Sequence, residues 1–395
     1  MTHVSTPGPS RALTEPDAGG RVRLRIPPAA TAVALFTAAR LLGLACVVAT
    51  ARMHGKHALA LLGRSWDSIW YLAIAVHGYG RTLHPRPGIV HSDLAFFPLY
   101  PVLVRAVHMM TPLSGGAAGL VVAWTAAAVA AWGIYAVGAL LHGRAVGTAL
   151  ALLWGLLPHS VVLSMGYTEP VLTACAAWSL HAVLGGRWVR AGALAALAGL
   201  SRPNGFAVAV AVMAAAAATL VRERGRASPG VWTGAALAPL GWTAYVLWVG
   251  RRSGDLLGGY VRVQRLWGSR FDFGRGSLRF AKHLALQRDA LLFSMALVLV
   301  AAAVLLFALL LADRAPLPLT VYSGVLLAVA LGDAGFFQCK PRFLLPAFPL
   351  LLPLARALTR TARARPRHAA VVACALAGLS SGYGAYLVVV THTPL

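Results

Sequence analysis

The stretch "ALLFSMALVLVAAAVLLFALLLA", residues 290–312, contains no charged side chain over its whole length. About 20 apolar residues in a helix cross the hydrocarbon core of a bilayer, so this stretch predicts a membrane-spanning helix. Similar apolar runs recur along the chain, at residues 29–51, 117–141, 146–164, 167–184, 191–221, 231–250, 317–335, 343–358 and 369–391. The pattern predicts about 10–11 transmembrane or re-entrant helices.

The composition of the whole chain supports this prediction. Of the 395 residues, 58% are hydrophobic and only 12% are charged, against roughly 25% charged residues in soluble domains. We therefore predict an all-α polytopic membrane protein whose single domain covers residues 29–395. Residues 1–28 are rich in Pro, Gly, Ser and Arg, which predicts a disordered basic tail in the cytosol.

The charge distribution predicts the orientation of the helices. The formal net charge is +24, but the arginines lie in short segments between apolar runs, at residues 142–145, 185–190, 222–230 and 359–368. With the N-terminus inside, all four segments fall on the cytosolic side, as the positive-inside rule requires. The charge therefore indicates topology and does not indicate nucleic-acid binding. The two long connections, residues 52–116 and 251–288, then lie outside.

One apolar run is interrupted within the membrane. Residues 191–221 would be about 46 Å long as a helix, too short to cross a core of about 30 Å twice. The sequence "SRPNG" at 201–205 must therefore break the helix, because proline and glycine interrupt helical hydrogen bonding. Either two short helices meet in a hairpin, or the region is buried among other helices. Irregular backbone at this depth is tolerated where it is packed in protein or lines a cavity.

Several charged residues stand at the outer ends of apolar runs. Glu169 in "SMGYTEP" could be an ordinary acid at a helix start, or part of a site. Arg202 in "SRPNG" needs an anion, either Glu169 or a ligand phosphate. Lys340 and Arg342 begin a proline-rich run, where long cations can reach the membrane surface or bind an anionic head group. The second outer connection contains both arginines and aromatic residues at 258–276. This segment could be a plain surface loop or a mobile cover over a lipid-linked phosphate.

The first outer connection carries two more carboxylates. In "RSWDSIWYLAIAVHGYG", residues 64–80, the apolar positions Ile69, Leu72, Ala73 and Val76 have helical spacing and predict an amphipathic helix along the membrane surface. Asp67 could cap this helix, but Ser65 could do so equally well. Asp93 follows 26 residues later in "HSDLAFFPLYP". The two carboxylates could act together as a base and its supporting acid.

Together these motifs resemble those of the PIG-V-like mannosyltransferases. The matching segments, in the same order as in that family, are "WDSIWYLAIAVHGYG" (66–80), "DLAFFPLYP" (93–101), "SMGYTEP" (164–170), "LSRPNG" (200–205) and "KPRFLLPAFP" (340–349). Two departures stand out. Pro203 replaces a serine of the family pattern, and Asp93 stands where members with a known eukaryotic role tend to have Glu, so the acceptor need not be a GPI precursor.

The resemblance implies a GT-C glycosyltransferase fold with its active site facing away from the cytosol. It also implies a polyprenyl-phosphate mannose donor. The sequence indicates no further cofactor and no divalent metal, and it leaves the metal requirement open. Asp67 and Asp93 are then the expected catalytic residues. The expected substrate-binding residues are Glu169, Arg202, Asn204, Lys340, Arg342, Trp66, Tyr71, His77 and Tyr167. The expected partners are the lipid-linked donor, membrane lipids and a glycan or lipid acceptor, with a partner membrane subunit left open and no nucleic acid.

The sequence thus predicts an inverting mannosyltransferase in which Asp67 takes the proton of the acceptor hydroxyl. Other lipid-linked sugars or a protein acceptor are alternatives within the same architecture. A lipid or solute transporter is an alternative from another class, since broken helices and intramembrane charges also mark transport pathways. A non-catalytic membrane subunit is the third alternative. Arginine far outnumbers lysine and alanine is abundant, which indicates a bacterial source and a plasma-membrane location. In a eukaryote the location would be the ER membrane.

Overall fold

The computed structural model describes residues 27–86, 89–286, 291–391 and 393. The predicted cytosolic tail, residues 1–28, lies outside the described residues except for its last two. The apolar part of the chain forms helices α1 (Pro28–Met53), α5 (Gly115–His142), α6 (Arg144–Gly155), α7 (Glu169–Leu184), α8 (Trp188–Gly199), α9 (Phe206–Arg222), α10 (Pro229–Leu237), α11 (Leu240–Arg252), α14 (Leu291–Ala312), α15 (Leu317–Gly332), α17 (Leu352–Ala364) and α18 (Pro366–Ala385).

The shorter elements lie mainly in the two long connections. The first connection holds α2 (Ala58–Gly63), α3 (Asp67–His77), β1 (Thr82–Arg86), β2 (Ile89–Ser92), η1 (Asp93–Ala95) and α4 (Leu99–Met110), and the second holds α12 (Gly259–Leu266) and α13 (Arg275–Leu286). The remaining short elements are η2 (Ser160–Ser164), η3 (Pro203–Gly205), η4 (Phe337–Cys339), α16 (Lys340–Leu344), η5 (Phe348–Leu351) and η6 (Tyr386–Val390). The antiparallel pair β1–β2 was not predicted from the sequence.

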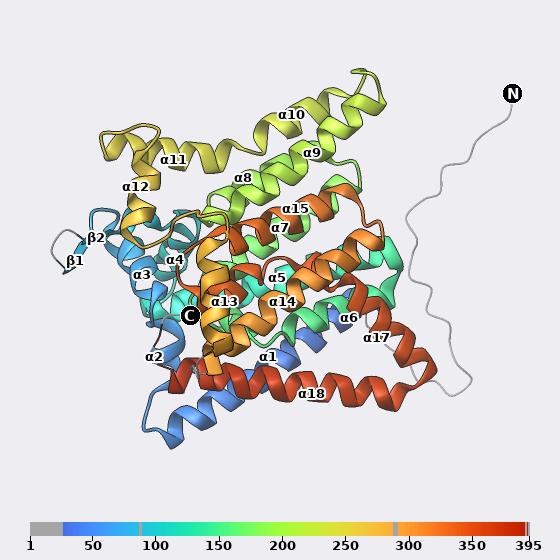
Figure 1. Cartoon of the computed structure of the whole chain (residues 1–395), viewed down its shortest axis with the longest axis horizontal. Coiled ribbons are helices and arrows are strands. Elements are labelled where there is room, and N and C mark those ends of the chain that lie inside the picture. The colour runs from blue at the N-terminus through green and yellow to red at the C-terminus, as the bar shows by residue number, and fades with distance from the viewer. Residues whose placement is uncertain (1–26, 87–88, 287–290, 392, 394–395) are drawn as a thin grey trace, which may run out of the picture.

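Both long connections lie at the same end of the helices. Figure 1 shows α2, α3, α4, the β1–β2 hairpin, α12 and α13 on the left, where the long helices end. The turns between α5 and α6, between α9 and α10, and between α17 and α18 lie at the opposite end. These turns carry the basic residues on which the predicted orientation depends. The arrangement agrees with the predicted separation of basic turns from long connections.

The long helices are suited to a membrane. Within the described residues, five helices are long and apolar enough to cross a bilayer, namely α1, η3 with α9, α5, α14, and α18 with η6, and a bent pair would make a sixth. On α14, large apolar side chains such as Val298 and Leu305 are exposed. Apolar surface of this extent is expected to contact lipid. The protein is an integral membrane protein.

The predicted 10–11 segments include re-entrant ones, and several of the apolar runs are interrupted and form shorter helices. The predicted span 146–164 ends as a helix at Gly155, and the chain then continues through Pro158 and the short η2 to the start of α7. The predicted span 231–250 is divided into α10 and α11 just before Pro239. Proline cannot donate a helical hydrogen bond, and its ring disfavours the helical conformation of the preceding turn. The apolar segments are therefore present, but many are short.

The run 191–221 forms two helices that meet at the predicted break. The helix α8 packs on α9, on α10 and on α11. The break itself is tied to the first connection, because the Leu99 amide donates to the Leu200 carbonyl at 3.0 Å. The Trp242 indole donates to the Pro203 carbonyl at 2.9 Å. With twelve residues, α8 is only about 18 Å long, so the break is recessed from the end of the bundle.

Helix α3 forms where the amphipathic pattern predicts a helix, but the protein buries a different face. Trp70, Tyr71 and Ile74 are buried against α4 and α5, whereas Ile69 and Val76 are exposed. The sequence pattern could not distinguish these faces because both are apolar. The exposed face is the one expected to lie against lipid.

The two long connections pack together through aromatic side chains. Trp267, which follows α12, contacts Trp70 edge to face with 5.1 Å between ring centroids. The Trp267 indole also donates to the Ser92 carbonyl at 2.9 Å. Edge-to-face aromatic contacts add to the free energy gained by burying the rings. Each connection therefore stabilises the other over the end of the helix bundle.

The orientation can be tested by thiol labelling. In a variant with all four native cysteines replaced by alanine, we would introduce Thr82→Cys in the hairpin or Ser228→Cys in the α9–α10 turn, both at exposed positions. A membrane-impermeant maleimide added to intact cells is expected to label Thr82→Cys at once and Ser228→Cys only after permeabilisation. The reverse pattern would invert the orientation.

Candidate functional site

Four charged side chains from distant parts of the chain meet at the end of the bundle that carries the long connections. The Arg342 guanidinium binds Asp67 through Nη2 and Glu169 through Nε, and the Arg202 guanidinium binds the same Glu169 oxygen. We call these four residues the ion network. Asp67 and Arg342 are separated by 275 residues of sequence. The fold therefore brings together four of the residues that the sequence singled out.

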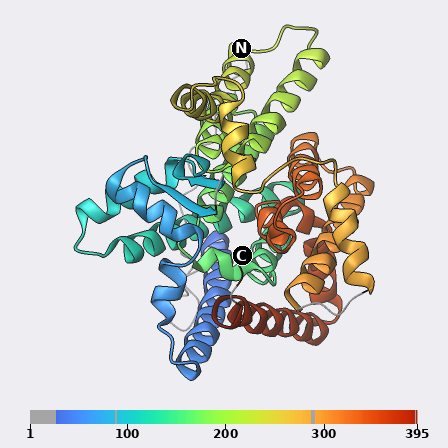
Figure 2. The same cartoon turned by 60° about the vertical axis from the view of Figure 1, so that its left-hand side comes forward.

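Helix starts and helix breaks supply the members of the ion network. Asp67 is the first residue of α3 and Glu169 is the first residue of α7. The unpaired amides of a first helical turn and the positive end of the helix dipole stabilise a carboxylate there. Arg202 lies directly before η3, and Arg342 lies in the five-residue α16. Figure 2 shows the parts that carry Asp67 (blue to cyan), Arg202 (green to yellow) and Arg342 (orange to red) arranged around a common centre.

Burial differs across the ion network. The side chains of Glu169, Arg342 and Arg202 are 0%, 3% and 7% exposed, but the Asp67 side chain is 28% exposed. Burying charged groups without partners would be very costly, and two carboxylates with two guanidinium groups balance each other. Asp67 is therefore the member of the network that a substrate can reach from outside.

Aromatic residues hold the ion network in place. The Arg342 guanidinium lies over the Tyr167 ring, 4.3 Å from its centroid, which is a cation–π contact. On the other side, Tyr71 of α3 forms a 3.3 Å hydrogen bond with Thr168 Oγ1, directly before Glu169. Burial raises the pKa of the Tyr71 hydroxyl to about 12, so this hydroxyl stays protonated at neutral pH. Two residues predicted to bind substrate thus support the charged side chains.

Several buried polar atoms beside the ion network have no hydrogen-bond partner among the described residues. They come from the start of α3, the segment before α7, and the break around η3, and they are Ser68 Oγ, Tyr167 Oη, Glu169 Oε2, Arg202 Nε and Asn204 Oδ1. Buried polar groups in native proteins are almost always paired. A group of orphaned donors and acceptors next to a partly exposed carboxylate indicates a place where a polar ligand binds.

Asp93 and Lys340 have other contacts. The Asp93 carboxylate accepts hydrogen bonds from the amides of Gly80 and Arg81, both at 2.8 Å, and it is fully buried. It therefore fixes the loop that follows α3. The Lys340 ammonium donates to the carbonyls of Ala330 at 2.5 Å and Asp333 at 2.6 Å, at the end of α15. Among the described residues, neither side chain forms an ion pair with the four members of the network.

Within the part of the chain that the structure describes, three further predicted residues make no ion pair with the network. Asn204 lies in η3 and is buried. Trp66 directly precedes Asp67 and has a φ of 56°, a strained conformation for a bulky residue that is seen mostly at functional sites. His77 ends α3 and is exposed, in a shallow hollow that it shares with Tyr79 and Arg81. His77 is thus about one α3 length from Asp67.

Sequence reasoning missed the polar residues between α6 and α7. His159 is 2% exposed, and both of its ring nitrogens lack a partner among the described residues. Its neighbour Ser160 is bound by Arg40 from the middle of α1. An ionisable residue inside an apolar run is a signal for function in membrane proteins, and "LLPHS" at 156–160 carries that signal. The histidine is easy to overlook because the apolar run at 146–164 predicts one continuous helix.

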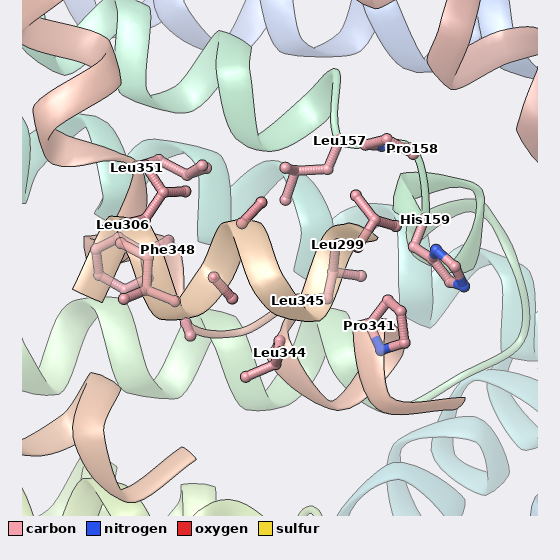
Figure 3. A pocket seen from close by; sticks show the side chains of 14 residues that line it. Leu157, Pro158, His159, Leu299, Leu306, Pro341, Leu344, Leu345, Phe348 and Leu351 are labelled. Carbon is pink, nitrogen blue, oxygen red and sulfur yellow. The ribbon is translucent and has the colours of Figure 1, made fainter. Parts of the chain in front are cut away.

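An apolar cavity of about 90 Å³ lies next to the ion network. Its walls come from α14, from α16 to η5, and from the segment after α6 (Figure 3). Nearly all of the lining is hydrocarbon, and His159 is the exception. Pro341, which lines the cavity, directly precedes Arg342. The cavity therefore combines an apolar wall with a position beside the charged residues.

Sequence comparison identifies no family for this chain. No protein-family model matches the chain, and no curated protein matches its sequence. The predicted membership of the PIG-V-like family therefore stays a prediction.

Comparison with solved structures finds alignments with oligosaccharyltransferase structures from Archaeoglobus fulgidus. The oligosaccharyltransferase of Archaeoglobus fulgidus in its apo form aligns with a TM-score of 0.49 at 14% identity, over 92% of this chain and 56% of that one. The same enzyme, AglB, in complex with an inhibitory peptide and a dolichol-phosphate aligns with a TM-score of 0.46 at 14% identity, over 91% and 55%. A third structure, tethered to an acceptor peptide, gives 0.45 at 13%, over 91% and 54%. This chain spans little more than half the length of the proteins that it matches.

The structural weight of the ion network can be tested by breaking it. Arg342→Met leaves two carboxylates without their shared cation, and removal of one partner of a buried ion pair typically costs about 3–5 kcal/mol. Arg356→Met is the matched control, because Arg356 pairs with Asp313 at 2.6 Å with both side chains about a third exposed. That change is expected to cost about 0–1 kcal/mol. Thermal unfolding of the purified protein in one detergent measures both, and equal shifts would contradict the buried network.

Proposed function

We propose that this protein is a membrane glycosyltransferase of the GT-C type that moves a sugar from a polyprenyl-phosphate donor to an acceptor hydroxyl. The observation that carries the proposal is Asp67, a partly exposed carboxylate bound by the buried Arg342 guanidinium, which shares Glu169 with the buried Arg202 guanidinium. This transfer needs a carboxylate for the acceptor proton, cations for the leaving phosphate and an apolar surface for the lipid chain. All three lie within one region of the protein.

In the proposed step, Asp67 takes the proton of the acceptor hydroxyl. The hydroxyl oxygen forms a bond to the anomeric carbon of the donor sugar while the bond from that carbon to the phosphate oxygen breaks. The electron pair of the broken bond leaves with the polyprenyl phosphate, and attack from the opposite face inverts the anomeric configuration. Arg342 binds Oδ2 of Asp67, so the proposal assigns the proton to Oδ1.

The guanidinium groups stabilise the charge that develops on the leaving phosphate. Arg202 uses Nη1 for Glu169, while its buried Nε has no partner among the described residues and can donate to a phosphate oxygen. Donors that are already oriented in a buried site need no reorganisation during the reaction. Glu169 keeps both guanidinium groups in position, and Asn204 and Tyr167 are proposed to contact the sugar or the phosphate.

The lipid chain is proposed to enter the apolar cavity. The cavity begins beside Pro341, one residue from Arg342, and continues along Leu345 and Phe348. A chain bound there would leave its phosphate near the ion network. Apolar walls with a few polar groups at one end are typical of sites for such ligands.

The finer assignments rest on the sequence motifs. Mannose as the donor sugar follows from the resemblance to PIG-V-like mannosyltransferases, as does a lipid or glycan acceptor. The active site is proposed to lie on the non-cytosolic face. The position of the ion network, at the end opposite the basic turns, supports this proposal. Asp93 is proposed to support the acceptor through the loop that it fixes, and Lys340, Trp66 and His77 are proposed to bind substrate around it.

The role of Asp67 can be tested with an isosteric change. Asp67→Asn keeps the size of the side chain but removes the base, so transfer from polyprenyl-phosphate mannose should fall about 10²–10⁴-fold. The assay is the formation of labelled hexose product by purified protein in lipid vesicles with membrane extract as acceptor. Asp255→Asn, on the exposed second connection, is the control and should keep full activity. Normal transfer by a folded Asp67→Asn protein would remove Asp67 from the mechanism.

A further inference from the structure

His159 is a buried titratable residue to which the sequence motifs assign no function. It lies in the irregular segment between α6 and α7, with 2% of its surface exposed. Neither Nδ1 nor Nε2 has a hydrogen-bond partner among the described residues. Imidazole always carries at least one N–H donor, and burial of an unpaired donor is costly. The His159 ring contacts the Tyr383 ring edge to face, with 5.5 Å between centroids, but no hydrogen bond among the described residues uses either nitrogen.

His159 is one of the residues that line the apolar cavity. In Figure 3 it lies at one end of the cavity together with Pro341, while Leu306, Phe348 and Leu351 lie toward the other end. The other lining residues are leucine, alanine, proline and phenylalanine. A ligand that matches this lining is a hydrocarbon along most of its length and carries a hydrogen-bond acceptor at the His159 end.

The backbone around His159 is held firmly. The Ser160 hydroxyl donates to the carbonyls of Gly155 at 2.8 Å and Leu157 at 2.7 Å, and it lies 3.0 Å from the Ser380 hydroxyl of α18. Arg40 of α1 binds the same hydroxyl. Three helices thus fix the residue next to His159. A side chain on such a support is oriented before a ligand arrives, which is a feature of built binding sites.

The guanidinium groups of Arg202 and Arg342 are the cationic hydrogen-bond donors of the neighbouring ion network. Arg342, next to the cavity residue Pro341, is close enough to act electrostatically on the His159 ring. A phosphate ester offers three outer oxygens, one each for Arg202, Arg342 and His159, whereas a carboxylate offers two. A phosphate group has enough oxygens for all three.

We propose that His159 donates a hydrogen bond to the phosphate of a polyprenyl phosphate whose first hydrocarbon units occupy the apolar cavity. This inference rests on the proposed function, since it names a residue that binds the leaving group of the donor. His159 contacts the phosphate on the side of the lipid chain, and Arg202 contacts it on the side of Asp67. His159 therefore favours the binding of lipids that carry a phosphate over neutral lipids with the same hydrocarbon chain.

The test measures lipid affinity and needs no sugar transfer. Purified protein in nanodiscs is titrated with polyprenyl phosphate, with the matching polyprenol and with inorganic phosphate. The wild type is expected to prefer polyprenyl phosphate over both. His159→Phe keeps a ring of similar size but loses the donor, so affinity for polyprenyl phosphate should fall about 10–100-fold, as expected for a hydrogen bond to a charged group. Affinity for polyprenol should stay the same.

Two further variants separate the parts of the proposal. His159→Gln keeps an N–H donor at a similar reach and should recover most of the preference for the phosphate. Ala303→Phe fills the cavity from α14, where Ala303 is buried, and should weaken both lipids equally. If His159→Phe fails to fold, His159→Leu is the second donor-free variant, and it should lose the preference for the phosphate in the same way.

Each result has a defined meaning. If His159→Phe keeps the preference for polyprenyl phosphate, the inference is overturned, while sugar transfer by the same variant would leave the proposed function standing. If inorganic phosphate binds as well as the lipid phosphate, the cavity plays no part and the inference is overturned. If the wild type shows no preference between polyprenyl phosphate and polyprenol, the inference and the proposed donor fall together.

Discussion

The pairing of Arg342 with both Asp67 and Glu169 is the interaction on which the rest of the site depends. A charged group at this depth needs a partner, and each of these groups finds it in a segment far away in the sequence. The pairing fixes α3 against α7 and α16, and Arg202 adds the break between α8 and α9. The ion network thus acts as a tie between the first outer connection and three interrupted membrane segments.

The breaks in the membrane helices follow from the same requirement, that each buried charged group needs a partner. A continuous helix keeps its backbone groups paired and presents side chains only sideways, whereas a helix that ends inside the protein presents its first residue along its axis. Glu169 uses such an end, and the proline-bearing breaks beside Arg202 and Arg342 turn these side chains toward it. The backbone irregularity is tolerated because the segments around Tyr167 and Asn204 are buried in protein. Shorter helices and a recessed site are therefore two aspects of one arrangement.

Much of the fold could be predicted from the sequence, and the limits have physical causes. The apolar runs predict the helices, and the basic turns predict which ends lie together, because both signals are local. The end of α6 at Gly155 was missed because Pro158 lies inside an uninterrupted apolar run. The buried face of α3 was missed because burial depends on α4 and α5, and both faces of α3 are apolar.

Only part of the site could be predicted, because a pairing between distant segments leaves no local pattern in the sequence. Motifs singled out Asp67, Glu169, Arg202 and Arg342, but no local pattern indicates that Arg342 joins the two acids. Lys340, two residues earlier, has the same sequence context and yet caps the end of α15. His159 was missed because its polarity becomes informative only once the residue is seen to line an apolar cavity.

The central claim is that the ion network and the neighbouring cavity form one site for a lipid-linked phosphate. The most direct measurement is an electron cryo-microscopy structure of the protein in nanodiscs with polyprenyl phosphate bound. The account predicts density for the phosphate within hydrogen-bonding distance of Arg202 and His159, with the hydrocarbon chain passing Pro341 toward Phe348. Density for the lipid at another place on the protein, with the ion network and the cavity unchanged, would contradict it.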